Sequence, residues 1–291
     1  MVSRTFSISA SSRSAGRFTN RAERADSISS KRNRSASCAW AHRRCARCRS
    51  GRYNLCPDVI FAATPPCDGA LIELVCYPAD FCFPLPDGVT TDVGSLAEPI
   101  CCGVHTAERG SISLGDRVAI LGDGPIALST LMAVQASGGR VVMLTGLVAE
   151  RMKLAEELGA ERVLNAAQED VVAAGKALDV DVAIDCAGAP ATPQQCIDIV
   201  RRGGRAVLIG LPSTDSTPIN VPRCIAKEVD VIAVMRYANN FPAAVELLRR
   251  RLTDARKLIT HRFGFSQVAD AFKLVHELRD GVIKAVIDFG K

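Results

Sequence analysis

The sequence predicts an α/β fold centred on a doubly wound parallel sheet, and two observations lead to this prediction. The run RVAILGDGPIA, residues 117–127, places a short apolar strand directly before a glycine-rich turn and a helix. Between about residues 117 and 235, further short apolar runs alternate with helical patterns, as expected for strands that are buried on both faces of a sheet. The 291 residues exceed the usual size of one hydrophobic core, so a second domain is expected.

The glycine-rich turn has the layout that holds a dinucleotide pyrophosphate. Gly122 permits a tight turn, and Gly124 removes a side chain that would keep phosphate away. Pro125 suits the first helical turn, and Ile126 and Ala127 complete the pattern G-x-G-x-x-A. We therefore expect this helix N-terminus to bind NAD or NADP in a nicotinamide-dependent oxidoreductase. A sheet that binds another ligand is the alternative.

Hydrophobic periodicity predicts five more strands and the helices between them. The second strand, residues 140–145, precedes an amphipathic helix over residues 149–158 that Gly159 ends. The remaining strands are expected at residues 162–165, 180–185, 205–210 and 229–234. This succession matches the two-halved nucleotide-binding architecture.

One element of the nucleotide fingerprint is missing at the end of the second strand. An acidic residue about 20 positions after the glycines normally accepts hydrogen bonds from the adenosine ribose, but residues 144–147 read LTGL. Arg151 is placed to meet a ribose 2′-phosphate instead, because a guanidinium binds phosphate bidentately and no carboxylate repels it. A solvated helix residue beside Glu150 is the alternative. The choice between NAD and NADP stays open, with a slight preference for NADP.

Positive charge is concentrated at the N-terminus. Residues 1–52 contain 13 Lys and Arg side chains and two carboxylates, a net charge of +11, so the overall +5 leaves −6 for the other 239 residues. Residues 1–41 are rich in Ser and Arg and poor in large apolar side chains, so we expect them to be disordered. A transit peptide, a basic arm and a faulty reading frame are the competing explanations.

Composition also bears on partners and location. The longest apolar runs are strand-sized, far below the ~20 residues that cross a bilayer, so no membrane association is expected. The basic segment lacks interleaved aromatic residues, so no nucleic-acid partner is expected. Twelve cysteines without a secretory segment indicate reduced thiols and a cytoplasmic protein, or a mitochondrial one if the N-terminus is a transit peptide.

Cysteine spacing predicts a structural zinc site. The motif Cys45-x2-Cys48-x7-Cys56 lies in a polar loop, and His42 stands three residues before it. Four N and S donors suit tetrahedral zinc, which pins a loop that has no core of its own. The other cysteines that we expect to be small buried hydrophobes are Cys67, Cys76, Cys82, Cys101, Cys102, Cys186, Cys196 and Cys224.

Several longer runs resemble a known family. These runs are GRYNLCPDVIFAATPPCDGA (residues 51–70), PADFCFPLPDGVTTDVGSLAEP (78–99), LGDGPIA, RYANNFP (236–242) and THRF (260–263). They resemble the polyol dehydrogenases, the sorbitol and xylitol dehydrogenases of the zinc-dependent medium-chain dehydrogenase/reductase superfamily. The resemblance covers about residues 42–291 and implies a Rossmann nucleotide domain inserted into a GroES-like, β-rich catalytic domain.

The resemblance implies domain limits, an activity and an assembly. Residues 42–102 and 236–291 would form the catalytic part, and residues 103–235 the nucleotide domain. The implied reaction oxidises a secondary alcohol of a sorbitol-like or xylitol-like polyol by hydride transfer to NAD(P), with zinc polarising the alcohol oxygen. Homodimers or homotetramers are the expected assembly.

The resemblance also implies roles for three residues. Glu98 matches the glutamate placed at the catalytic zinc or its bound water, and Arg236 and Tyr237 match a pair near substrate and cofactor. Considered alone, Glu98 also suits a helix dipole, and the pair also suits a strand-end salt bridge and a half-buried aromatic ring. His105 is expected to be a hydrogen-bonded core histidine rather than a metal ligand.

The resemblance fails upstream of His42, where the family carries a ligand cysteine and a Gly-His-Glu motif. Residues 1–41 contain one cysteine, Cys38, and no histidine. Glu98 alone would not retain zinc, because catalytic sites use three protein ligands plus water. We therefore expect the catalytic domain to be incomplete and to lack a competent catalytic zinc. A truncated, inactive NAD(P)-binding relative is thus the alternative to an active enzyme. By resemblance, His42 occupies the position of the first of the family's four structural cysteines. The zinc site survives if the imidazole replaces that thiolate, and it is lost if the residues before His42, which do not resemble the family, place the imidazole elsewhere.

Overall fold

The computed structural model describes residues 5–8, 34–36, 39–41, 43–64, 67–72, 75 and 77–290. The chain forms two compact units, one of Pro99–Tyr237 and one of Met1–Glu98 with Ala238–Lys291. The first corresponds to the nucleotide domain, for which the sequence predicts residues 103–235.

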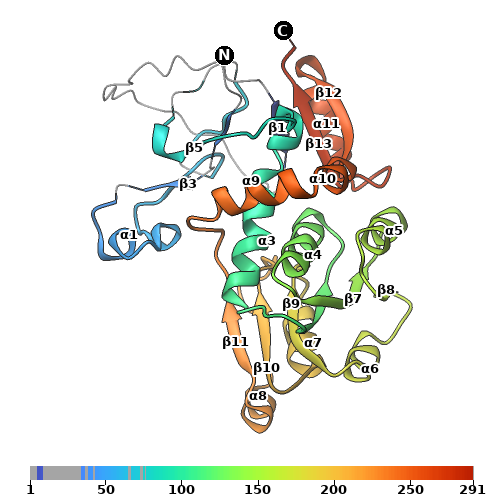
Figure 1. Cartoon of the computed structure of the whole chain (residues 1–291). Helices are drawn as coiled ribbons and strands as arrows, with labels where there is room; N and C mark the ends of the chain where they lie inside the picture. Colours follow the sequence, from blue (N-terminus) through green and yellow to red (C-terminus); the bar gives the residue numbers. More distant parts are fainter. Residues whose placement is uncertain are drawn as a thin grey trace. The chain divides into compact units, whose positions relative to one another are not determined.

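The unit Pro99–Tyr237 contains a parallel sheet of six strands. Their order is β11-β10-β9-β6-β7-β8, so the sheet grows outward in both directions from its first strand, as predicted (Figure 1). The strands are β6 (Arg117–Leu121), β7 (Arg140–Gly146), β8 (Val163–Asn165), β9 (Val180–Asp185), β10 (Val200–Leu208) and β11 (Asp230–Ala233). All six predicted strands are confirmed.

Strand β10 differs from its prediction, since it begins five residues earlier than residue 205. Its pairing with β9 shifts register between Val200 and Arg205. Gly203 and Gly204 lie in this interval, and Gly203 has a φ of +67°, which glycine adopts without strain. The early part lacks an apolar run, so periodicity does not reveal it.

Helices cover the sheet on both faces. They are α3 (Ala97–Arg109), α4 (Pro125–Ala136), α5 (Ala149–Glu157), α6 (Val171–Lys176), α7 (Thr192–Ile199) and α8 (Val221–Lys227). Helices α4 and α5 pack on β6, β7 and β8, whereas α6, α7 and α8 pack on β9 and β10 (Figure 1). Gly103 permits close contact between α3 and α4, because a Cβ there would lie 2.6 Å from the Ser129 carbonyl.

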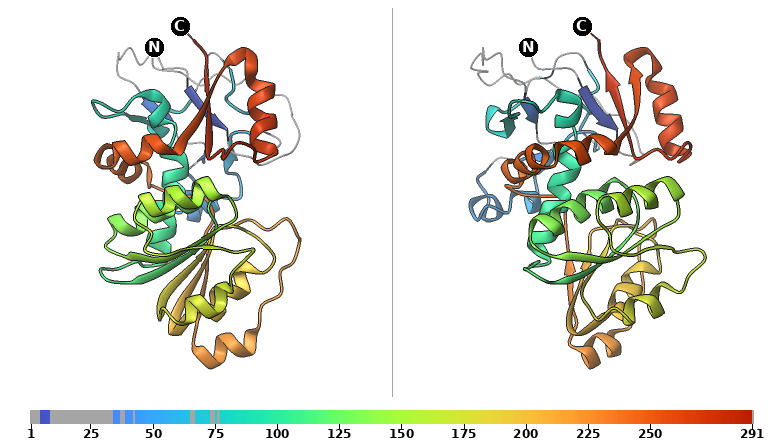
Figure 2. Two further views of the ribbon diagram at one scale, coloured as in Figure 1. Left: turned by 90° about the vertical axis from the view of Figure 1, so that its right-hand side faces the viewer. Right: turned by 45° about the vertical axis from the view of Figure 1, so that its right-hand side comes forward.

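The other unit is built from short elements. Its strands and helices are β1 (Thr5–Ile8), β2 (Arg34–Ala36), β3 (Ala39–Trp40), α1 (Ala46–Arg49), β4 (Ile60–Phe61), β5 (Cys82–Pro84), α2 (Thr91–Gly94), α9 (Phe241–Arg250), α10 (Leu252–Leu258), β12 (Ile259–Gly264), α11 (Val268–His276) and β13 (Lys284–Asp288). They form the sheets β1-β13-β12, β2-β5 and β3-β4. Figure 2 shows β1 beside the C-terminal strands.

Three of these strands lie in the segment for which disorder is expected. β1 pairs antiparallel with β13, β2 with β5, and β3 with β4, so distant strands supply their backbone hydrogen-bond partners. Local composition does not contain this information. The rest of residues 1–41, apart from Ala41, lies outside the described residues, so the expectation of disorder is untested there.

Among the described residues, no helix combines the length and the apolar character that a bilayer crossing requires.

Candidate functional site

The glycine-rich turn joins β6 to α4 at the carboxyl edge of the sheet. Gly122 has a φ of +125°, and a Cβ on it would lie 3.1 Å from the Ala187 nitrogen. Only glycine meets both constraints without strain. The Gly122 N–H donates to the Thr145 carbonyl at 3.0 Å, which ties the turn to the end of β7.

The start of α4 fits the phosphates of a dinucleotide. A Cβ on Gly124 would have no heavy atom within 4 Å, so open space adjoins the backbone there. Pro125 is the first helical residue, and the first helical hydrogen bond runs from the Leu128 N–H to the Gly124 carbonyl. The N–H groups of Ile126 and Ala127 precede this bond and are therefore available for an anion.

Arg151 lies in α5 and is buried, with 7% of its surface exposed. Its Nη1 lies 3.8 Å from Oδ1 of Asp123, which belongs to the glycine-rich turn. The expectation that Arg151 binds a 2′-phosphate depends on a missing carboxylate. In the folded chain a carboxylate is present, because Asp123 places its side chain beside the Arg151 guanidinium.

Asp123 is a site residue that sequence reasoning missed. The sequence does contain a sign of this role. Asp123 is an acidic residue between the two glycines of the turn, while Gly146 occupies the position at the end of the second strand where an acidic residue usually lies. Recognising the exchange requires knowing that the turn and the end of β7 are adjacent, which Gly122 and Thr145 establish.

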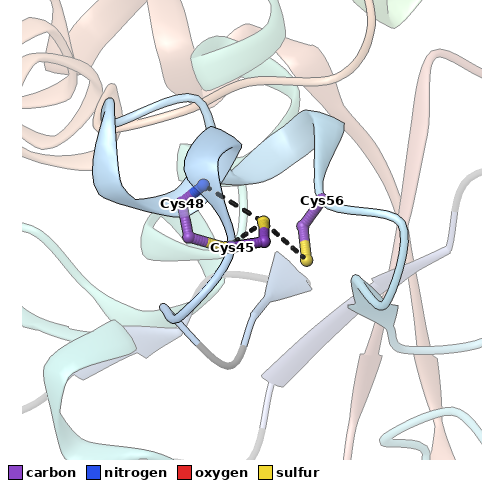
Figure 3. Close-up of side chains that lie close together, drawn as sticks. All are labelled: Cys45, Cys48 and Cys56. Atoms are coloured by element: carbon purple, nitrogen blue, oxygen red, sulfur yellow. Dashed lines mark hydrogen bonds between the residues drawn. The ribbon is translucent and has the colours of Figure 1, made fainter.

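The described cysteines of the polar loop converge as the spacing predicts (Figure 3). The Cys45 sulfur lies 3.5 Å from that of Cys48 and 3.8 Å from that of Cys56. Helix α1 produces this geometry, since Cys45 caps it and the Cys48 N–H donates to the Cys45 sulfur at 3.4 Å. His42, the fourth expected ligand, lies outside the described residues.

These three thiols fit zinc, which takes four N or S donors. The Cys48 N–H lowers the pKa of Cys45, because its hydrogen bond stabilises the thiolate. Burial raises the pKa of Cys56 to about 11, so metal binding there releases a proton at neutral pH. The described part of the chain contains no other cluster of three His, Cys, Asp or Glu side chains able to share an ion.

The other predicted residues are dispersed. Glu98 is half-buried in the first turn of α3, and the described residues bring no pair of further ligands to it. The residues that the structure describes therefore do not fit a catalytic zinc, which needs three protein ligands. His105 lies further along α3, with its Nδ1 3.8 Å from Glu108 Oε2.

Arg236 and Tyr237 follow the last strand of the sheet. Arg236 is half-buried with a φ of +53°, a conformation that is uncommon outside glycine. Tyr237 is completely buried, rather than half-buried as its residue type alone suggests. Both residues interact with other parts of the chain, and their roles toward substrate and cofactor remain predictions.

The other described cysteines are free thiols. Cys101, Cys102 and Cys196 are buried as expected, whereas Cys67, Cys82, Cys186 and Cys224 are only partly buried. Burial of the thiol raises the pKa of Cys186 to about 12 and raises that of Cys196 well above its ordinary value, which keeps both protonated. Cys76 lies outside the described residues.

The parallel sheet and the glycine-rich turn are typical of a nucleotide-binding protein, the three cysteines fit a metal ion, and comparisons identify the family. Residues 125–250 match the family model described as zinc-binding dehydrogenase. Sorbitol dehydrogenase of Bacillus subtilis (strain 168) is 36% identical over 248 residues, which are 84% of this chain and 70% of that protein. Sorbitol dehydrogenase of Macaca fascicularis is 40% identical over 232 residues, 78% and 65% of the two chains.

A solved structure shows the same relationship. A protein classed as a zinc-binding dehydrogenase from Sinorhizobium meliloti 1021, bound to NADP, is 27% identical to the chain with a TM-score of 0.81. The match covers 91% of this chain and 78% of that one. The chain belongs to the zinc-binding dehydrogenase family, and its match spans between 65% and 70% of the length of the two curated relatives named above.

Proposed function

We propose that the chain is an NAD(P)-dependent oxidoreductase that oxidises a secondary alcohol of a small, sorbitol-like or xylitol-like polyol. The open space at Gly124, in front of the first N–H groups of α4, is the observation that carries the proposal. Family membership and the two sorbitol dehydrogenase relatives support the reaction and the substrate class.

In this proposal the backbone of the glycine-rich turn binds the cofactor, and the residues that follow β11 are assigned to the substrate. When bound, the nicotinamide would supply the acceptor for the hydride that leaves the alcohol carbon, and the hydroxyl proton would pass to water. The N–H groups of Ile126 and Ala127 hold the pyrophosphate, and Gly124 lets it approach the helix. Arg236 offers a cationic donor to the polyol, whereas Tyr237, which is completely buried, is assigned to the substrate by resemblance alone.

Zinc enters this proposal as a structural ion. The zinc ion would be bound by Cys45, Cys48 and Cys56 together with His42. The bound ion would hold the loop in one conformation, since the loop has no hydrophobic core of its own. Glu98 is assigned to the reaction centre by resemblance alone. No catalytic step is assigned to a zinc ion, because the described residues do not supply its ligands.

A second candidate function is nucleotide binding without hydride transfer. The observation that favours it is the lack, among the described residues, of a ligand cluster around Glu98. The intact sheet and turn would then retain the cofactor while the chemistry is lost.

A turnover assay separates the two candidates. The 291-residue chain, supplied with zinc, is mixed with sorbitol or xylitol and with NAD or NADP, and reduced cofactor is followed by its near-ultraviolet absorbance. Turnover supports the oxidoreductase. Cofactor binding without turnover supports the second candidate, and the absence of both contradicts the proposal.

Location and assembly complete the proposal. The free thiols of all ten described cysteines suit a reducing compartment such as the cytoplasm. A homodimer or homotetramer is proposed from the resemblance, and light scattering after gel filtration tests it. A monomer in this measurement contradicts that part of the proposal.

A further inference from the structure

Asp123 connects the glycine-rich turn to the end of β7. Its side chain is almost completely buried, with the residue 9% exposed. Oδ2 accepts hydrogen bonds from the N–H groups of Leu147 and Val148, both at 2.8 Å. The carboxylate is therefore fixed at the point where the second strand of a nucleotide-binding fold meets the adenosine ribose.

Gly146 leaves the space that the Asp123 side chain fills. A Cβ on Gly146 would lie 2.7 Å from Asp123 Oδ2 and 2.8 Å from Asp123 Cβ, well inside van der Waals contact. An acidic residue at position 146 would therefore collide with the Asp123 side chain in its present conformation. In this chain the carboxylate comes from the turn rather than from the strand end.

The charges around this carboxylate disfavour a second phosphate. Oδ2 is occupied by the two N–H groups, so Oδ1 faces Arg151 Nη1 at 3.8 Å. A ribose 2′-hydroxyl is able to donate a hydrogen bond to Oδ1. A 2′-phosphate has only acceptor oxygens and negative charge, and Asp123 both repels it and competes for Arg151.

We infer that Asp123 is the ribose-recognising carboxylate of this chain and that it determines a preference for NAD over NADP. This inference rests on the proposed function, since it specifies how the same nucleotide site selects its cofactor. It reverses the cofactor preference that follows from Gly146 and Arg151 in the sequence alone.

The test is the ratio of two dissociation constants, measured by calorimetric titration of the full chain with NAD and with NADP. Wild-type protein should bind NAD more tightly. Asp123→Asn keeps a side-chain oxygen for the two N–H groups but removes the charge. A charge-assisted hydrogen bond is worth enough to move the NADP-to-NAD ratio by about 10-fold to 100-fold toward NADP.

A relocated carboxylate provides the matched control. The double variant Asp123→Gly/Gly146→Asp returns the acid to the strand end and removes the two Asp123 atoms that would collide with it. The third close atom, Met152 Cγ at 2.7 Å from the new Cβ, belongs to a flexible side chain that is able to shift, so NAD preference should return. A purely structural role of Asp123 would weaken both cofactors equally and leave the ratio unchanged.

The outcomes separate the two proposals. If neither cofactor binds wild-type protein, the proposed function fails and this inference fails with it. If a cofactor binds but wild-type protein prefers NADP, or if Asp123→Asn leaves the ratio unchanged, only the assignment of Asp123 is overturned.

Discussion

Replacing Gly103 by alanine tests the packing of α3 on α4. A Cβ at this position would lie 2.6 Å from both the carbonyl carbon and oxygen of Ser129 and 2.8 Å from the Thr130 nitrogen. Ordinary contacts between carbon atoms are ~3.5–4.0 Å. Since all three neighbours are backbone atoms of a buried helix, α3 and α4 must move apart by roughly 1 Å.

Two opposing effects determine the size of the change. Alanine favours a helix interior by roughly 1 kcal/mol relative to glycine. Overpacking against a rigid neighbour costs about 1–3 kcal/mol, and here the collision involves backbone rather than a rotatable side chain. Overpacking should therefore win, and we expect Gly103→Ala to lower the free energy of unfolding by about 1–2 kcal/mol.

Thermal unfolding followed by circular dichroism measures this change. For a chain of this size the expected loss corresponds to a Tm lower by roughly 2–8 °C. Gly264→Ala is the control, because its new Cβ would make only an ordinary 3.7 Å contact with the Gln267 side chain and its φ of −72° suits alanine. The reasoning is refuted if Gly103→Ala is as stable as wild-type protein, or if the control loses more stability.

Two further predictions concern the metal loop and an ion pair. Cys48→Ala should abolish the zinc retained after dialysis, as measured by atomic emission, while Cys82→Ala should retain it; unchanged zinc in the first variant rules the site out. Burial opposes ionisation of Asp181, but the Arg117 N–H and the Arg201 guanidinium outweigh it and lower its pKa. The lowered pKa stabilises the fold fully above the unfolded value of about 3.9 and progressively less as the pH falls from there through the folded pKa, so Asp181→Asn should be destabilised in urea titrations at neutral pH. That difference should vanish near pH 2, and a constant difference down to this pH contradicts the prediction.

The sheet could be predicted because its signals are local. Each strand is a continuous apolar run, and the turn after β6 uses glycines for reasons that the backbone alone dictates. The six-stranded order then follows from the connection rules of doubly wound sheets. The convergence of Cys45, Cys48 and Cys56 was equally predictable, since a short helix and a following turn fix their spacing.

The features that the sequence did not predict depend on contacts between segments that are far apart in the chain. β1 forms beside β13, nearly the whole chain away, so composition alone indicates disorder there. The exchange between Asp123 and Gly146 is likewise not visible in the sequence, because the two residues are 23 positions apart and only the folded sheet brings them together. Arg151 was interpreted without its carboxylate neighbour for this reason.

Cofactor titration of wild-type protein and Gly124→Val tests the central claim most directly. The valine side chain would enter the open space in front of α4, where no atom of the fold lies within 4 Å of the new Cβ, so it should block the pyrophosphate without unfolding the protein. Gly264→Val, whose Cβ would make only an ordinary 3.7 Å contact with Gln267, is the control. The account predicts that wild-type protein and the control bind NAD and that Gly124→Val does not. Equal binding by all three proteins would contradict it.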